Sequence, residues 1–271
     1  MQRMLTLVAA LAFLSIGAWS FVNQDVVDNW IVERSLSSEH EDAPLLGLQE
    51  NETWLVLVVD FDSNEAANGW GPNEAQNLLG QSASNYFHQV SGNTTNVELV
   101  IHPEVIRANN ELAYYGSDSS DRDVDEQGNF MPTELAMEAV QSVAKTMDWG
   151  PFDLDDDGTV DRLLILHSTK GQEENPAVKN RIWSHFTHFD SHIVVDGEHT
   201  VGHYTMASLQ TGTSGIGTIL HEMMHQMGAV DLYPVHDNAQ SQAWNGVGDW
   251  DIMASGNWNG GGQWPALPTG P

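Results

Sequence analysis

The sequence contains no cysteine, which excludes disulfides, thiolate metal ligands and a cysteine nucleophile. Basic residues are scarce, with 9 Lys and Arg against 38 Asp and Glu, so the formal net charge is −29. A chain this acidic is repelled by nucleic acid and by anionic lipid surfaces, and we expect neither as a partner. Long apolar runs are also scarce, because no segment beyond the amino-terminal stretch is long enough to cross a membrane.

The residues that are present indicate a folded protein with metal chemistry. Hydrophobic residues make up 41% of the chain, with 10 Trp, 8 Phe and 5 Tyr, which is enough to build a core and excludes a disordered acidic tail. A length of 271 residues suggests one large domain or two small ones. The 12 histidines outnumber the lysines, and this unusual ratio points to metal ligands.

Residues 1–20 have the pattern of a secretory signal peptide. A short positive region at Arg3 precedes apolar residues 5–16, and small residues follow at Ala18 and Ser20. The alternative is an uncleaved anchor, but the apolar run is short for the roughly 30 Å of a bilayer core. We expect a secreted, extracellular protein without stable membrane association after cleavage, in which residues 21–50 form a linker or a short pro-segment.

Hydrophobic patterning after residue 50 predicts strands that alternate with helices. Apolar runs rich in β-branched residues are typical of buried strands, and apolar residues spaced by three and four are typical of amphipathic helices. The expected strands are residues 53–61, 97–101, 162–167, 193–195 and 200–209, and the expected helices are residues 73–90, 133–149 and 213–228. Residues 200–209 alternate in a way that suits a sheet edge. The pattern predicts an α/β or α+β domain that is mostly irregular after Tyr233.

The strongest motif is His221-Glu222-Met223-Met224-His225, the HExxH pattern. One helical turn places His221 and His225 on the same face, where two neutral imidazoles can bind one Zn²⁺. Glu222 can reach a metal-bound water and take its proton without binding the metal. The alternative is a helix with two solvated histidines, but the apolar flanks indicate a buried helix, in which these polar side chains need partners.

The chain after this motif offers a third zinc ligand. Gly228 can adopt the left-handed conformation that ends a helix, so the chain can turn back and present Asp231. Two histidines and one carboxylate leave a fourth position for water, as a catalytic zinc site requires. Asp237, Asp249 and Asp251 remain alternative carboxylates.

The extended motif HExxHxxGxxD, followed by Gly-Asp-Trp-Asp-Ile-Met-Ala-Ser-Gly at residues 248–256, resembles the immune inhibitor A family of secreted zinc metallopeptidases, relatives of the metzincins. The resemblance covers most of residues 52–265. It implies a metzincin-like α+β fold with a mixed twisted sheet, an active-site helix and an irregular C-terminal subdomain. It also implies that Met253 forms a Met-turn beneath the zinc ligands, whereas on its own Met253 would be ordinary core.

The resemblance also bears on domain organisation. We expect residues 51–271 to form a metallopeptidase catalytic domain. Domains of this family normally continue past the Met-turn, but this chain stops soon after it at Pro271. The expected catalytic domain is therefore either truncated at its C-terminus or unusually short. The sequence leaves open whether residues 21–50 inhibit the enzyme.

An aspartate-rich segment at residues 153–161 predicts a calcium loop. Alternate carboxylates with a glycine for the sharp bend supply the oxygen ligands that Ca²⁺ prefers. The expected ligands are Asp153, Asp155, Asp157 and Asp161 through their side chains and Thr159 through its carbonyl. The helix–loop–helix calcium motif fits poorly, because its twelfth position is Leu164 rather than glutamate. The alternative is a solvated acidic turn, in which the carboxylates would repel one another.

These observations predict a secreted zinc-dependent endopeptidase that acts on proteins or peptides. Zinc would polarise the scissile carbonyl, and Glu222 would activate water and then protonate the leaving amine. Tyr233 is a candidate for contact with the substrate or the oxyanion. An extended substrate would add a strand beside residues 200–209, the expected sheet edge. The alternative function, a secreted non-catalytic metal-binding or adhesion module on the same fold, leaves Glu222 without a role.

The remaining histidines give weaker signals. They fall between expected strands at His185, His188 and His192, and on or beside them at His167, His199 and His203. Each is expected to be a packing or surface residue.

Overall fold

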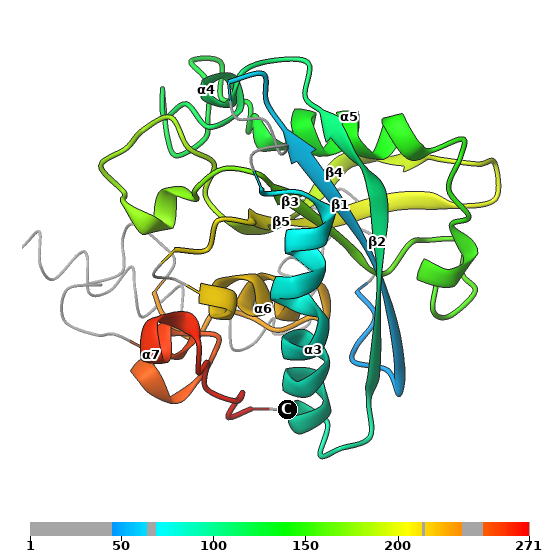
Figure 1. The fold of residues 1–271 in the computed structure, drawn as a ribbon, viewed down its shortest axis with the longest axis vertical. Helices are drawn as coiled ribbons and strands as arrows, with labels where there is room; N and C mark the ends of the chain where they lie inside the picture. The colour runs from blue at the N-terminus through cyan, green and yellow to red at the C-terminus, as the bar shows by residue number, and fades with distance from the viewer. Residues whose placement is uncertain (1–44, 64–68, 213–214, 235–245, 271) are drawn as a thin grey trace, which may run out of the picture. The chain divides into compact units, whose positions relative to one another are not determined.

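A five-stranded mixed sheet organises the computed structural model, which describes residues 45–63, 69–212, 215–234 and 246–270 (Figure 1). The strand order is β2-β1-β3-β5-β4. The strands are β1 (Asn51–Asp60), β2 (Asn96–Arg107), β3 (Leu163–His167), β4 (His185–Val194) and β5 (Thr200–Ser208). β4 runs antiparallel to β5, and the other pairs are parallel. This mixed sheet with its helices confirms the predicted α+β class.

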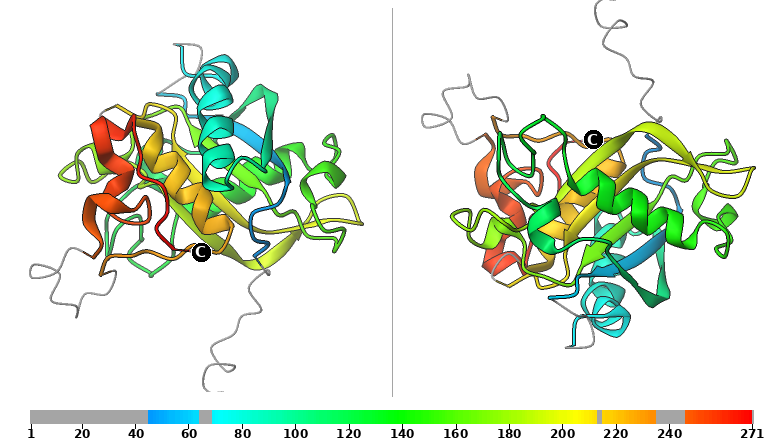
Figure 2. Two further views of the ribbon diagram at one scale, coloured as in Figure 1. Left: turned by 90° about the horizontal axis from the view of Figure 1, so that it is seen from below. Right: turned by 90° about the horizontal axis from the view of Figure 1, so that it is seen from above.

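Helices cover both faces of the sheet, which explains why β1 is an almost continuous apolar run. Leu55, Leu57 and Val59 pack on the face of α5 (Pro132–Val143), and the residues between them pack on the face of α3 (Pro72–Val90) and α6 (Gly215–Gln226). Figure 2 shows the sheet between these two helical layers. The described residues all belong to one compact unit, Ala43–Pro271.

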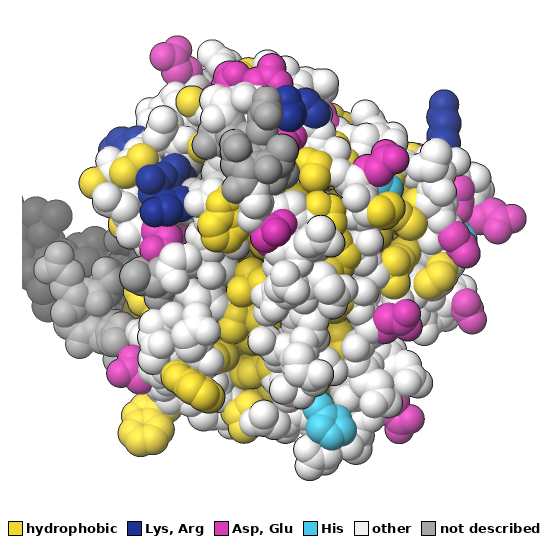
Figure 3. Space-filling view, viewed as in Figure 1, with side chains coloured by type: hydrophobic (Ala, Val, Ile, Leu, Met, Phe, Trp, Pro, Cys, Tyr) yellow, Lys and Arg dark blue, Asp and Glu magenta, His cyan; other side chains and the backbone are white. Residues whose placement is uncertain are grey.

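Among the described residues, the remaining helices are short. They are α4 (Leu112–Tyr115), η2 (Gly150–Phe152), η3 (Gln172–Glu174), η4 (Gly248–Trp250), η5 (Ser255–Trp258) and α7 (Asn259–Gly262). The described part of the chain after α6 is therefore largely irregular, as the sequence predicts. Acidic side chains are scattered over the face shown in Figure 3 rather than gathered in one place, as a dispersed negative charge requires.

Besides β4, which the sequence predicts only at residues 193–195, two predicted elements differ clearly in length from the observed ones. The helix expected over residues 133–149 ends at Val143, because the chain then turns and Trp149 is buried with its indole N–H donated to the Ala144 carbonyl, 3.0 Å away. The strand expected over residues 97–101 continues to Arg107. Pro103 is tolerated there because β2 is an edge strand, where a missing backbone donor leaves no neighbour unpaired.

The predicted sheet edge is wrong. β5 lies between β3 and β4, and eight of its nine residues are buried, so β4 is the edge strand on that side. The alternation in β5 comes from buried polar residues that have partners: Thr205 donates to the Glu222 carbonyl (3.2 Å) and Ser208 to the Thr169 carbonyl (2.6 Å). Conversely, the histidines expected between strands lie on β4. Because many residues of β4 are polar and partly exposed, its hydrophobic pattern does not predict a strand.

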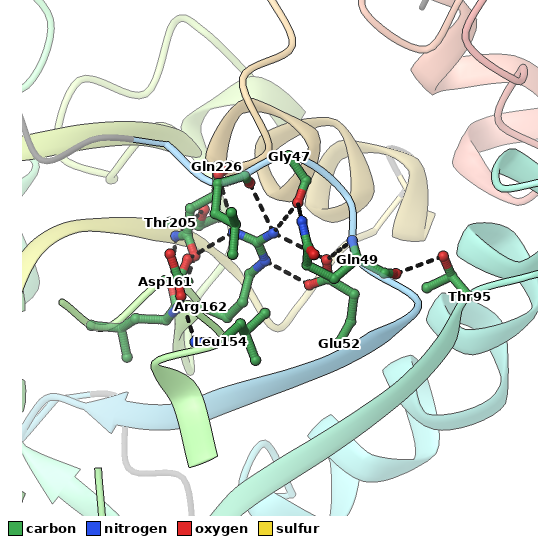
Figure 4. A network of polar contacts seen from close by, with 11 residues as sticks. Gly47, Gln49, Glu52, Thr95, Leu154, Asp161, Arg162, Thr205 and Gln226 are labelled. Carbon is green, nitrogen blue, oxygen red and sulfur yellow. Dashed lines mark hydrogen bonds and ion pairs between the residues drawn. The ribbon is translucent and has the colours of Figure 1, made fainter. Parts of the chain in front are cut away.

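Residues 45–50 lie against the domain. The fully buried guanidinium of Arg162 forms an ion pair with Glu52, with Nε 2.6 Å from Oε2, and donates to the carbonyl oxygens of Leu46 (2.9 Å) and Gly47 (3.0 Å) (Figure 4). The predicted signal peptide and most of the predicted linker fall within residues 1–44, outside the described residues. None of the helices that the structure describes combines the length and apolar character that a membrane span needs.

Candidate metal centre and cleft

Helix α6 presents the HExxH motif in a buried position. Its apolar residues pack in the core beneath the sheet, and His221 and Glu222 are only 4% and 7% exposed. The imidazole rings of His221 and His225 lie one helical turn apart, with centroids separated by 4.8 Å and planes nearly perpendicular. The predicted pair therefore shares one face of the helix.

The chain turns back after α6 as the motif predicts. Gly228 has a φ of 88°, a left-handed conformation that a side chain would make costly. The turn places Asp231 Oδ1 3.2 Å from His221 Nε2 and 3.4 Å from His225 Nε2. Among the alternative carboxylates, Asp249 and Asp251 are outside this group, and Asp237 lies outside the described residues.

The three ligand atoms fit a tetrahedral metal ion. His221 Nδ1 faces the Ile252 carbonyl (2.7 Å) and His225 Nδ1 faces the Ala229 carbonyl (2.8 Å), so each Nδ1 carries the hydrogen and each Nε2 presents a lone pair. Asp231 Oδ1 is buried without a hydrogen-bond donor. Two atoms bound to a tetrahedral Zn²⁺ lie about 3.3 Å apart, which matches the observed separations. A cation at this point would satisfy all three lone pairs at once.

The electrostatics of the group favour positive charge. Burial alone would lower the pKa of His221, but its close contact with the Asp231 carboxylate and the charge of Glu222 outweigh burial and raise that pKa to about 9. Although burial opposes ionisation of Asp231, its two histidine contacts hold the pKa of this carboxyl well below its usual range. Burial raises the pKa of Glu222, which neighbours these residues but is not one of the three converging groups.

Met253 lies on a buried turn that contacts the segment carrying the candidate metal ligands. The backbone N–H of Leu232 donates to the Met253 carbonyl (2.7 Å), next to Asp231. The Met253 N–H donates to Asp251 Oδ1 (2.7 Å), and the carbonyl of Ile252 accepts the hydrogen bond from His221 Nδ1. These bonds fix residues 251–254 against His221 and Leu232, and the Met-turn itself stays a prediction.

Two adjoining cavities form a cleft at the three converging groups. One, of about 370 Å³, extends over α6 toward Ala254 and Trp258, and the other follows the beginning of β4 toward Phe186. Both are lined by Trp183, His221, Glu222 and Tyr233. Burial and the nearby Asp231 raise the pKa of Tyr233, so its hydroxyl remains a neutral hydrogen-bond donor. The structure thus brings the predicted Tyr233 to the cleft.

Two acidic side chains that fix the cleft wall, Asp123 and Glu173, carry no signal in the sequence. Asp123 accepts a hydrogen bond from the backbone N–H of Trp183 (2.9 Å), and the Trp183 carbonyl accepts one from His185 Nδ1 (2.7 Å). Glu173 accepts from Ser184 Oγ (2.7 Å). These residues come from separate segments of the chain and have no motif spacing, so only the folded chain shows that they meet.

The predicted calcium loop forms a partial cluster. Carboxylate oxygens of Asp153, Asp155 and Asp161 come within 4.8 Å of one another, and burial raises the pKa of Asp161 to about 6. Asp157 is not in this cluster, because its Oδ1 accepts the backbone N–H of Thr159 (2.7 Å) within the turn.

Comparisons with known proteins identify the family of this chain. The model of the immune inhibitor A peptidase M6 catalytic domain matches residues 60–268. Pre-pro-metalloprotease PrtV, from two strains of Vibrio cholerae serotype O1, is 28% identical in an alignment of 212 residues that covers 69% of this chain and 22% of PrtV. The chain therefore spans less than a quarter of that relative's length. OgpA from Akkermansia muciniphila covers 85% of this chain and 61% of its own at 13% identity, with a TM-score of 0.42, a likeness too distant to bear on function. Because the family model matches most of its length, the chain belongs to the immune inhibitor A peptidase family M6, in the catalytic domain.

Proposed function

We propose that this chain is a zinc-dependent endopeptidase. The observation that supports this most directly is the position of Asp231 Oδ1, which lies at zinc-ligand separation from two imidazole nitrogens and lacks a donor of its own. His221, His225 and Asp231 would hold the metal. When bound, Zn²⁺ supplies Lewis acidity toward a carbonyl and a water at the open position.

Glu222 is the proposed proton carrier. Its carboxyl lines both cavities of the cleft, and burial raises its pKa, so it can hold a proton between two steps of a reaction. In peptide hydrolysis it would take a proton from the attacking water and pass it to the leaving amine. Tyr233 borders the same space and would donate its hydroxyl hydrogen to the developing oxyanion.

The substrate would bind along β4, in place of the 200–209 strand that the sequence favours. β4 is the edge strand, and its first residues line the cleft beside the metal ligands. An extended peptide can add a strand to such an edge, using backbone hydrogen bonds that do not depend on sequence. The fixed backbone of Trp183 and Ser184 suits this role, because binding then orders only the peptide.

Glu222→Gln tests the mechanism directly. The variant should retain one zinc by metal analysis and lose casein hydrolysis by at least about a hundredfold, as loss of a general base predicts. Glu104→Gln on the distant strand β2 is the matched control and should keep full activity. Chelation of wild type should abolish activity and zinc should restore it. Full activity in zinc-loaded Glu222→Gln would disprove the proposed mechanism.

The alternative is a non-catalytic metal-binding module. It predicts zinc binding but no chelator-sensitive hydrolysis by wild type under any condition in which the metal is present. The buried Glu222 argues against it, because a retained carboxylate costs burial energy without a role in binding.

Export is part of the proposal. Residues 1–20 would direct secretion and be removed, and residues 21–50 would form a linker or pro-segment preceding the catalytic domain. Amino-terminal sequencing of protein recovered from the medium, with a start near residue 19 or 21, tests the cleavage.

A further inference from the structure

A second pair of histidines lies near the metal centre but outside it. His203 on β5 is completely buried, and neither of its ring nitrogens has a hydrogen-bond partner in the described structure. Leaving a buried polar atom unpaired costs about 1–3 kcal/mol, so two on one ring call for an explanation. Burial lowers the pKa of His203 to about 3, and the imidazole is therefore neutral with a lone pair available.

The second histidine of the pair is His188, which lies directly opposite His203 in the antiparallel pairing of β4 and β5. The two rings meet edge to face, with centroids 5.6 Å apart and planes at 81°. The zinc-ligand pair His221 and His225 has a similar arrangement, at 4.8 Å and 89°. Two imidazoles on adjacent strands can therefore approach one ion much as two imidazoles on one helix do.

The surroundings separate this pair from the catalytic group. The ring of Phe186 contacts both His188 (5.2 Å between centroids) and His203 (5.7 Å), and it stacks on His225 at 6.2 Å. The pair thus lies across one aromatic ring from a proposed zinc ligand. The charge of Arg162, which disfavours protonation of His203, is itself paired with Glu52.

The strand irregularity beside His188 allows further ligands. Register between β4 and β5 is lost between His188 and Ile193, and this segment holds Asp190 and His192. No third ligand atom of the described residues is preassembled here, in contrast to the catalytic group. An ion would therefore have two fixed imidazole ligands, with water or one of these side chains completing its coordination.

We propose that His188 and His203 form a second transition-metal site, distinct from the catalytic one and independent of proteolysis. The expected ions are those that favour imidazole, Cu²⁺ and Zn²⁺, with Cu²⁺ binding more tightly than Zn²⁺. With two preset ligands instead of three, the site should bind Zn²⁺ more weakly than the catalytic group. A bound ion would link the edge strand β4 to β5 beside the substrate groove.

Metal titration of the full chain tests the proposal. The protein is first loaded with one zinc and saturated with Ca²⁺, so that the catalytic group and the aspartate loop are filled. Wild type should bind a second equivalent of Zn²⁺ by calorimetry, and Cu²⁺ added to it should give a spin-resonance spectrum with imidazole nitrogen coupling. His203→Phe, which keeps an aromatic ring, and His188→Gln should both lose the second equivalent and retain the first. His102→Gln on β2 is the control and should bind like wild type.

Two outcomes would overturn the proposal. One is a wild-type protein that binds no second ion at about tenfold excess, in which case buried water pairs with His203. The other is a second equivalent that persists in His188→Gln. This variant changes a partly buried residue, so the test stands even if His203→Phe does not fold.

Discussion

The backbone N–H of Trp183 donates to Oδ2 of Asp123, a carboxyl that is completely buried beside the cleft wall. The nitrogen and oxygen are 2.9 Å apart. Because Trp183 lines both cavities, this bond fixes the place where the proposed substrate strand begins. Asp123 touches none of the converging metal ligands, so we assign it a positioning role.

Removing this acceptor should weaken substrate binding more than it slows the chemical step. Asp123→Ala leaves a buried N–H unpaired, which costs about 1 kcal/mol or more, so KM for a peptide should rise about fivefold while kcat and zinc content change little. Asp123→Asn retains a carbonyl oxygen at the same place and should restore KM. A fall in kcat without a change in KM, or no rescue by asparagine, would contradict the positioning role.

The same carboxyl should make stability depend on pH. Burial raises the pKa of Asp123 from 3.8 to about 7, so the folded state binds a proton that the unfolded state releases between these values. Stability from this group is present below the lower pKa and is lost as pH rises toward the upper one, by at most about 1.4 kcal/mol per pH unit. We compare the free energies of unfolding of wild type and Asp123→Asn, measured in urea from pH 4 to 8. As pH rises, wild type should lose stability relative to the variant. A constant difference would show that Asp123 is not protonated in the fold.

Arg162 should be the most costly charge to remove. Both members of its ion pair with Glu52 are fully buried, and truncation of one partner in such a pair costs about 3–5 kcal/mol. Arg107 is the control, because its side chain is 44% exposed where it pairs with the buried Asp60, so water hydrates this guanidinium and its removal should cost less. Arg162→Ala should therefore lose several times more unfolding free energy than Arg107→Ala. Equal losses would mean that solvent reaches Arg162.

The geometry of the candidate metal-binding segment was predictable because its information is local. Helical spacing places His221 beside His225, and one glycine allows the return to Asp231. The buried strands β1 and β3 were predictable for the same reason, since each is a short continuous apolar run. Local periodicity thus specifies both the core strands and the proposed zinc ligands.

The cleft wall was not predictable because it depends on residues distant in sequence. β4 has polar residues on its exposed side and an irregular register, so its histidines resemble a loop in the sequence. β5 alternates like an edge strand only because Thr205 and Ser208 find hydrogen-bond partners inside the fold. Which strand is the edge, and hence where a substrate strand would add, follows from tertiary pairing alone.

Calcium should stabilise the domain through the aspartate loop. The clustered oxygens of Asp153, Asp155 and Asp161 repel one another, and a bound Ca²⁺ at a hundredfold excess over its Kd would contribute about 2.7 kcal/mol, a rise in Tm of several degrees.

Asp155 is the informative residue for this test. Asp153 and Asp161 also accept backbone N–H groups of the loop, so changing them would disturb its structure, whereas Asp155 is exposed. Asp155→Asn should need about tenfold more Ca²⁺ for the same rise in Tm, because a neutral amide binds Ca²⁺ less strongly than a carboxylate. Asp156→Asn removes an adjacent charge outside the cluster, at a left-handed position that asparagine tolerates, and should respond like wild type. If both variants lose calcium response equally, the effect is general screening of negative charge and the loop is not a specific site.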